Sequence, residues 1–284
     1  MHFTQGLHRA VQQAPDGIAS ICNGRTTTFR ELHDRVARLA GALRALDIAP
    51  GDRVAIMALN SDHYLTYYLA LPWAGILVNP VNFRWSVEEV IYSLNDSSSV
   101  AIFLDDSFAP HAAALRDGCP SLKHLIFCGE ASCPAGMLSL EDLVAGHDPV
   151  ADMESGDDDT FGVFYTGGTT GAPKGVLLSH NNLCTSALGI MAEGPFPDGA
   201  VGLHAAPMFH LADMMMTTCL LMRGGTHVML GAFRPDTVLQ LVARHRISEL
   251  LLVPAMLQAL VDSPDMAGAD VGSVRHLLYG ASPA

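Results

Sequence analysis

Charged residues are scarce in this sequence, and basic ones are scarcer than acidic ones. Aspartate, glutamate, lysine and arginine make up 16% of the 284 residues, against about 25% in an average soluble domain. The 29 acidic and 16 basic side chains give a formal net charge of −13. A field of that sign repels phosphate backbones, which argues against a nucleic-acid partner. Hydrophobic residues make up 49% of the chain, and this share excludes a disordered protein.

Segments that would anchor the chain in a membrane or lock it with disulfides are lacking as well. The longest apolar stretch, residues 65–81, is interrupted by Pro72, Gly75 and Asn79, so it is too short and too broken to span a bilayer. The N-terminus has no basic-then-apolar signal pattern. The six cysteines include no C-x-x-C pair and show no zinc-finger spacing with histidines, so we expect free thiols in a reducing cytoplasm.

Helix and strand patterns alternate along most of the chain. Thr28 with Glu31 and Ser86 with Glu89 form two capping-box pairs, and each pair is followed by apolar residues at helical spacing. Largely apolar runs without strict alternation, typical of strands that are buried on both faces, occur at residues 54–59, 100–104, 124–128, 250–253 and 274–279. We therefore predict an α/β fold with layered, largely parallel sheets flanked by helices.

Two stretches bear on how the chain is divided and where it stops. Residues 148–159 contain five aspartates and one glutamate, and we interpret them as a surface linker between possible subdomains 1–150 and 160–284. Residues 280–284 are typical of a strand-to-helix turn, with Ser282 as N-cap and Pro283 at the first helical position. Because no helix follows, we expect an incomplete domain that is truncated at its C-terminus.

The stretch from residue 161 to residue 178 carries the clearest chemical signal. An apolar strand leads into a loop of glycines and threonines, and Lys174 opens a second apolar strand. Glycines let backbone N–H groups converge on an anion, threonine hydroxyls add donors, and the lysine adds a positive charge. The loop is not a Walker A motif, since Pro173 and Gly175 flank the lysine. This pattern predicts a phosphate-binding loop.

Residues 165–175 resemble the phosphate-binding signature of the adenylate-forming, or AMP-binding, superfamily. That superfamily includes acyl- and aryl-CoA ligases, luciferases and the adenylation domains of peptide synthetases. Further segments resemble the family in order and character, namely residues 28–32, 75–80, 205–210 and 278–283. The resemblance covers nearly the whole chain and is to the N-terminal portion of an acyl-CoA synthetase.

The resemblance implies a two-step reaction that uses ATP, Mg²⁺ and coenzyme A. A fatty or aromatic carboxylate attacks the α-phosphate of ATP to give an acyl-adenylate and pyrophosphate, and a thiol, usually that of coenzyme A, then takes the acyl group. Displacement at phosphorus needs positioning and charge neutralisation rather than a protein nucleophile. No Ser-His-Asp or Cys-His spacing in the sequence would supply such a nucleophile.

The same resemblance assigns roles to individual residues. Thr166 is also expected to face Mg²⁺, and Gly167 stands where serine is commoner, which removes one hydroxyl donor. Met208, Phe209 and His210 are implied to line the acyl pocket, whereas the methionines at 214–216 suit the pocket or the core equally well. The implied ATP site comprises Thr166, Gly167, Gly168, Thr169, Thr170, Gly171, Lys174, Gly280, Ala281 and Ser282.

Two other functions remain open at this stage. The family's Mg²⁺-binding glutamate, its ribose aspartate and its C-terminal catalytic lysine have no counterpart here, so we expect no catalytic residue in this chain and an inactive fragment. A truncated paralogue that only binds nucleotide is one alternative. An amino-acid-activating adenylation domain is the other, but such domains usually place an aspartate directly after the residue that matches Phe209. Here His210 follows, and Asp213 comes too late. The sequence leaves the acid, the acceptor thiol and the oligomeric state open.

Overall fold

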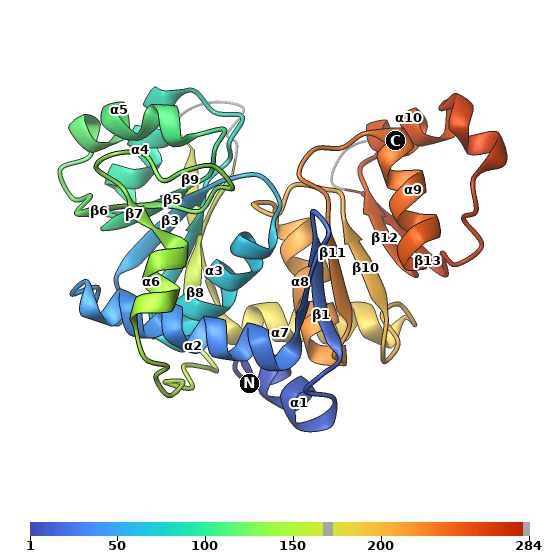
Figure 1. Cartoon of the computed structure of the whole chain (residues 1–284), viewed down its shortest axis with the longest axis horizontal. Helices are drawn as coiled ribbons and strands as arrows, with labels where there is room; N and C mark the ends of the chain where they lie inside the picture. The colour runs from blue at the N-terminus through green and yellow to red at the C-terminus, as the bar shows by residue number, and fades with distance from the viewer. Residues whose placement is uncertain (167–172, 281–284) are drawn as a thin grey trace. The chain divides into compact units, whose positions relative to one another are not determined.

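The protein is described by a computed structural model that covers residues 1–166 and 173–280 (Figure 1). Contacts between residues divide the chain into two compact units. Unit 1 comprises residues 1–4, 33–59 and 63–182, and unit 2 comprises residues 5–32, 60–62 and 183–284. Each unit is built around one sheet, and several helices contribute residues to both units.

The sheet of unit 1 has seven strands in the order β7-β6-β5-β3-β4-β8-β9. All neighbouring strands run parallel except β8 and β9, which are antiparallel. The strands are β3 (Arg53–Met57), β4 (Leu77–Pro80), β5 (Ala101–Leu104), β6 (His124–Phe127), β7 (Leu138–Ser139), β8 (Thr160–Thr166) and β9 (Lys174–Ser179). The helical segments with residues in this unit are α2 (Phe29–Ala45), α3 (Asp62–Trp73), α4 (Val87–Asp96), η1 (Ala109–His111), α5 (Ala112–Gly118), α6 (Leu140–Gly146) and the start of α7 (His180–Ala192).

Helix α3 supplies much of the core of unit 1. Its residues from His63 to Trp73 are all buried, so the interrupted apolar stretch forms a core helix followed by β4. The Tyr67 hydroxyl donates to the Val54 carbonyl at 2.6 Å and accepts from the Asn79 N–H at 2.8 Å. This one buried side chain therefore ties α3 to both β3 and β4, because a hydroxyl can donate and accept at once.

The sheet of unit 2 has six strands in the order β13-β12-β10-β11-β1-β2, and only β1 and β2 are antiparallel. The strands are β1 (Ile18–Cys22), β2 (Arg25–Thr28), β10 (Val201–His204), β11 (Thr226–Met229), β12 (Glu249–Leu252) and β13 (His276–Tyr279). The helical segments are α1 (Gln5–Gln13), α8 (Leu211–Arg223), α9 (Pro235–His245), α10 (Pro254–Val261) and η2 (Pro264–Gly268). The core between strands and helices contains Leu203, Val228, Val238, Leu250 and Leu252.

The predicted fold class is confirmed, since both sheets are largely parallel and carry helices between their strands. Both predicted capping boxes form: the Ser86 hydroxyl accepts from the Glu89 N–H at 3.3 Å, and the Ser86 N–H donates to the Glu89 carboxylate at 2.8 Å. The Thr28 hydroxyl likewise accepts from the Glu31 N–H at 3.2 Å. Pro254 occupies the first turn of α10, as predicted.

The strand predicted at residues 274–279 forms as β13, over His276–Tyr279, but the prediction that it lies in the core is wrong. Strand β13 has only β12 as a neighbour among the described strands, and Leu277 and Tyr279 are 43% and 64% exposed. An apolar strand is buried only when other strands or helices lie beside and over it. The sequence of the strand does not reveal which elements these are. The predicted cap at Ser282 lies outside the described residues.

The acidic segment at residues 148–159 packs on unit 1 and is not a linker between the units. The Trp73 indole N–H donates to the Val150 carbonyl at 2.9 Å, and the Thr4 hydroxyl donates to the Asp152 carboxylate at 2.6 Å. The N-terminal amino group pairs with Asp157. The division by contacts also differs from the predicted subdomains, because β1 and β2 join the sheet of unit 2 while β8 and β9 join that of unit 1. Subdomains 1–150 and 160–284 stay a prediction.

All six cysteines are free thiols, as expected. Five of them are buried, and Cys133 is half-buried. Burial raises the pKa of Cys22 and of Cys219 to about 12 and that of Cys119 to about 11. Of the helices in the described part of the chain, none has the length and apolar character needed to cross a bilayer.

Candidate nucleotide and acid site

Strands β8 and β9 bring together the two described ends of the predicted phosphate loop. Thr166 ends β8, Lys174 begins β9, and the antiparallel register pairs them directly. The Thr166 hydroxyl donates to the Lys174 carbonyl at 3.4 Å. The loop residues themselves, Gly167, Gly168, Thr169, Thr170 and Gly171, lie outside the described residues, as do Ala281 and Ser282 of the predicted ATP site. Gly280 follows β13 in unit 2.

The Lys174 side chain is exposed, and it forms no ion pair within residues 1–166 and 173–280. β8 runs parallel to β4, so Thr166 and Lys174 lie beyond the carboxyl end of a parallel strand. Ligands of open α/β sheets bind at that edge. An unpaired ammonium there suits an anionic ligand such as a nucleotide phosphate.

Tyr165 and Gly175 fix the strand ends behind this position. The Tyr165 hydroxyl donates to the Asp96 carboxylate at 2.6 Å, and burial together with Asp96 raises the pKa of Tyr165. Gly175 pairs with Tyr165 across the strands. A Cβ at Gly175 would lie 2.8 Å from Val163 Cγ2 and 3.1 Å from Tyr165 Cζ. The glycine after the lysine therefore serves close packing between β8 and β9, a role that the motif alone does not reveal.

The predicted acid-pocket residues lie in the connection from β10 to α8. Met208 and Phe209 are buried, at 1% and 6% exposure, whereas His210 is exposed at the N-cap position of α8. The rings of Phe209 and His210 have centroids 4.0 Å apart. Met214 and Met216 are fully buried, and Met216 packs in the core of unit 2. For these two methionines the geometry favours the core interpretation.

Asn60, which the sequence analysis did not single out, forms three hydrogen bonds to the backbone of this connection. Its side-chain amide donates to the carbonyls of His204 and Ala206 at 2.9 and 2.7 Å. Its carbonyl oxygen accepts from the Met208 N–H at 2.8 Å. Asn60 lies 144 residues before His204 and is 5% exposed. The only hint in the sequence is an asparagine directly after an apolar strand.

Three buried side chains, Asp213, His204 and His227, form a hydrogen-bonded row beside this connection, and no sequence pattern points to it. Asp213 Oδ2 accepts from His204 Nδ1 at 2.7 Å, and His204 Nε2 shares a hydrogen bond with His227 Nδ1 at 3.0 Å. All three side chains are fully buried, and their burial, with the nearby His204, lowers the pKa of His227 well below its usual value. Within the described residues, Asp213 Oδ1 and His227 Nε2 have no hydrogen-bond partner.

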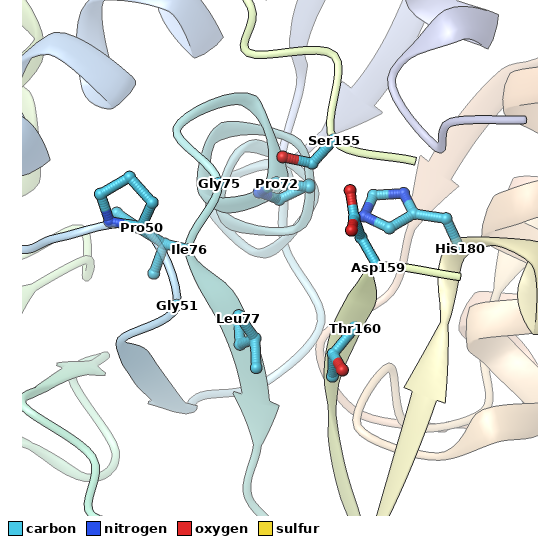
Figure 2. Close-up of a pocket in the computed structure, with 10 residues that line it drawn as sticks. All are labelled: Pro50, Gly51, Pro72, Gly75, Ile76, Leu77, Ser155, Asp159, Thr160 and His180. Carbon is cyan, nitrogen blue, oxygen red and sulfur yellow. The ribbon is translucent and has the colours of Figure 1, made fainter. Parts of the chain in front are cut away.

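A cavity of about 380 Å³ in unit 1 lies at the opposite edge of the sheet from Thr166 (Figure 2). Its lining includes Gly51, Leu77 and Thr160, at or just before the amino ends of β3, β4 and β8. His180 also lines it, and its Nδ1 accepts from the Phe3 N–H at 3.1 Å. Burial lowers the pKa of His180 to about 4. None of the predicted ATP or acid residues that the structure describes lines this cavity.

Thr166 is the residue that the sequence analysis predicts to face Mg²⁺, and its hydroxyl lies within the described part of the chain. Residues 1–166 and 173–280 contain no group of three or more histidine, cysteine, aspartate or glutamate side chains arranged to hold a metal. A single hydroxyl supplies one of the six oxygens that Mg²⁺ takes, and the others usually come from waters, carboxylates and substrate phosphates. The assignment of Thr166 to Mg²⁺ stays a prediction.

The architecture is that of the N-terminal domains of acid-activating ligases. The N-terminal domain of FACL13 from Mycobacterium tuberculosis superposes on all of this chain with a TM-score of 0.89, at 25% identity and over 70% of its own length. The anthranilate CoA ligase AuaEII shares the fold, with a TM-score of 0.91 over 99% of this chain and 55% of that one, at 20% identity.

The model of the AMP-binding enzyme family matches residues 7–284, and the chain belongs to this family. A feruloyl-CoA synthase from an Amycolatopsis species is 36% identical over 97% of this chain and 53% of its own length. A fatty acid–[acyl-carrier-protein] ligase, ScoC from Streptomyces coeruleorubidus, is 31% identical over 96% of this chain and 52% of its own. The chain spans about half the length of the curated relatives it matches. The resemblance seen in the sequence is confirmed.

Proposed function

We propose that the complete gene product activates a fatty or aromatic carboxylic acid with ATP and passes the acyl group to coenzyme A. The observation that carries the proposal is the family match over residues 7–284, with Lys174 exposed at the carboxyl edge of the unit 1 sheet. The matched relatives include a feruloyl-CoA synthase and a long-chain-fatty-acid–CoA ligase. A carrier-protein ligase among them makes a carrier-protein thiol the alternative acceptor.

In the first step, a carboxylate oxygen of the acid attacks the α-phosphorus of ATP. The bond from the α-phosphorus to the bridging oxygen breaks, and pyrophosphate leaves with the electron pair. Lys174 and the loop of residues 166–171 hold the β- and γ-phosphates, so that charge developing on pyrophosphate is neutralised without a protein nucleophile. Mg²⁺, when bound, adds positive charge at these phosphates, and Thr166 is the residue proposed to face it.

In the second step, the thiol sulfur attacks the acyl carbon, AMP leaves, and the thiol proton passes to solvent. Gly280, Ala281 and Ser282 are proposed to line the junction between adenine and acyl group. Met208, Phe209 and His210 are proposed to form a wall of the acid pocket. Asp213 is buried against His204 and so is already engaged, which supports a plain carboxylic acid over an amino acid as the substrate.

Acid-dependent exchange of labelled pyrophosphate into ATP tests the first step. We expect exchange with some members of a panel of fatty and aromatic acids, no exchange with amino acids, and thioester formation on addition of coenzyme A. Because the chain spans about half the length of its relatives, we propose that these 284 residues alone are inactive and form no acyl-CoA at a useful rate. ATP binding by the complete gene product without exchange for any acid would favour a nucleotide-binding protein instead.

A further inference from the structure

The connection between β10 and α8 has no regular secondary structure, and yet residues 205–209 are buried. Buried peptide groups must be paired, because an unpaired one costs about as much as a lost hydrogen bond. The backbone supplies only part of this pairing: the Ala205 N–H donates to the Leu203 carbonyl at 3.0 Å, and the His210 N–H donates to the Pro207 carbonyl at 3.1 Å. Side-chain groups must supply the rest.

The side-chain amide of Asn60 supplies three of these hydrogen bonds. Both Nδ2 hydrogens are used, one on the His204 carbonyl and one on the Ala206 carbonyl, and Oδ1 accepts from the Met208 N–H. An amide carries two donors and one acceptor oxygen, and in Asn60 both donors and the oxygen are bonded to the backbone at this connection. No other residue type of the same length offers two donors and an acceptor on one planar group.

Asn60 thereby fixes the backbone on which the proposed acid-pocket residues stand. One of its three bonds is to the N–H of Met208, the residue before Phe209, and the Phe209 ring in turn contacts His210. The Asp213–His204 bond holds the same connection where it leaves β10 and enters α8. A shift of the Ala206–Met208 backbone would therefore move the two rings of the pocket wall, and it leaves Lys174, on the sheet of unit 1, in place.

We propose that Asn60 is a positioning residue that sets the shape of the acid pocket and with it the choice of acid. This inference rests on the proposed function, because it takes the connection at residues 205–210 as the pocket wall. It adds that selectivity depends on a residue which touches no substrate and which lies far from the pocket segment in the sequence. A residue that only stabilised the fold would lower the amount of active protein and leave the relative use of acids unchanged.

The decisive variant is Asn60→Asp in the complete gene product, assayed by pyrophosphate exchange. The substitution keeps the shape but replaces both donors with an oxygen that faces two carbonyls. We expect the KM for the best acid to rise about tenfold or more, the KM for ATP to change less than about twofold, and the preference among acids to flatten. Asn60→Ser, which keeps one hydroxyl donor, should lie between the wild type and Asn60→Asp.

Asn79→Asp is the matched control. Asn79 is also a fully buried asparagine whose Nδ2 donates twice, to the Ser97 and Ser99 hydroxyls at 3.0 Å each, but it lies on β4 in unit 1. It should lower thermal stability without changing the ratio of KM values for two acids.

The proposal is overturned if Asn60→Asp raises the KM values for ATP and acid equally, if Asn79→Asp changes selectivity as much, or if neither Asn60 variant folds. A wild-type protein that shows no exchange with any acid would instead contradict the proposed function. The two failures are therefore distinguishable.

Discussion

Two connections follow parallel strands in this chain, one after β8 in unit 1 and one after β10 in unit 2, and they are built in opposite ways. The residues that flank the first, Thr166 and Lys174, are exposed, and the lysine has no acidic partner in the part of the chain that is described. The second, at residues 205–210, is buried through Phe209 and bound by Asn60 and His204. An exposed charge can attract a ligand of opposite charge, whereas a buried, hydrogen-bonded backbone holds the side chains that it carries in fixed positions.

This difference predicts how substitutions divide between binding and folding. A charge that is already in water costs the fold little when it is removed, so its loss appears in the affinity for a ligand. A polar group buried among partners leaves them unsatisfied when it is removed, so its loss appears in the free energy of unfolding. Changes at Lys174 and at Asp213 should therefore act on different measurements.

The largest effect on stability is expected at the buried, hydrogen-bonded side chains of Asp213, His204 and His227. Asp213→Ala removes the acceptor of His204 Nδ1 and leaves that buried nitrogen without its partner, so we expect a loss of about 3–5 kcal/mol in the free energy of unfolding. Urea denaturation measures it. Asp198→Ala is the control, because Asp198 is 72% exposed in its pair with Arg223, and its loss should cost about 1 kcal/mol or less. Equal losses would remove the distinction between the two connections.

Lys174→Ala tests the exposed side of the comparison. We expect ATP to bind about ten- to a hundredfold more weakly, which corresponds to roughly 1.5–3 kcal/mol for a charge-assisted contact. The free energy of unfolding should stay the same. Isothermal titration with ATP measures the affinity, and Lys123→Ala, the chain's other lysine, serves as the control. A similar loss from both substitutions would refute the assignment of Lys174 to the phosphates.

The dependence of stability on pH tests a buried polar group of unit 1, the imidazole of His180. The pKa of His180 is lowered to about 4 from an ordinary 6.5, so the unfolded chain takes up the proton first. Its contribution to stability is present above pH 6.5 and is lost as the pH falls toward 4, on the order of 2 kcal/mol.

His180→Asn should flatten this dependence, because the Asn carbonyl can accept from the Phe3 N–H in place of Nδ1. Unfolding free energies measured from pH 4 to 7 report the slope. The same substitution at the half-buried His111 should leave the slope as it is. An unchanged slope in His180→Asn would place the acid sensitivity elsewhere, with the histidines of unit 2 as the next candidates.

The smallest effect is expected at His210, whose ring is exposed and lies beside Phe209. His210→Ala should change the KM for the preferred acid by about fivefold, or roughly 1 kcal/mol, and should change the KM for ATP less. His245→Ala, on α9 of the same unit, is the control. A larger change in the KM for ATP than for the acid would assign His210 to the nucleotide or to the core.

Local signals were enough for the fold class and for the two strands that flank the predicted phosphate loop. The capping boxes at Thr28 and Ser86 are each encoded within four residues, and both formed as predicted. The exposure of Tyr279 was not predictable, because it depends on which strands lie beside β13.

The polar contacts around residues 205–210 were not predictable for a related reason. The hydrogen bonds from Asn60 join residues 144 and more positions apart, and no spacing in a single sequence reports such a pair. The His204–His227 bond depends on the register between two neighbouring strands. Register is set by packing across the whole sheet, so the two histidines looked independent.

The buried cysteines give each unit its own reporter of local opening. Unit 1 holds the buried Cys119 and Cys128, and unit 2 holds the buried Cys22, Cys184 and Cys219. A thiol with a pKa of about 12, such as that of Cys22 or Cys219, is a thiolate in roughly one molecule in ten thousand at pH 8, and the thiolate is the form that alkylating reagents attack. The rate at which each cysteine is alkylated, followed by mass spectrometry, would therefore record how often its own unit opens, without any label being engineered into the chain.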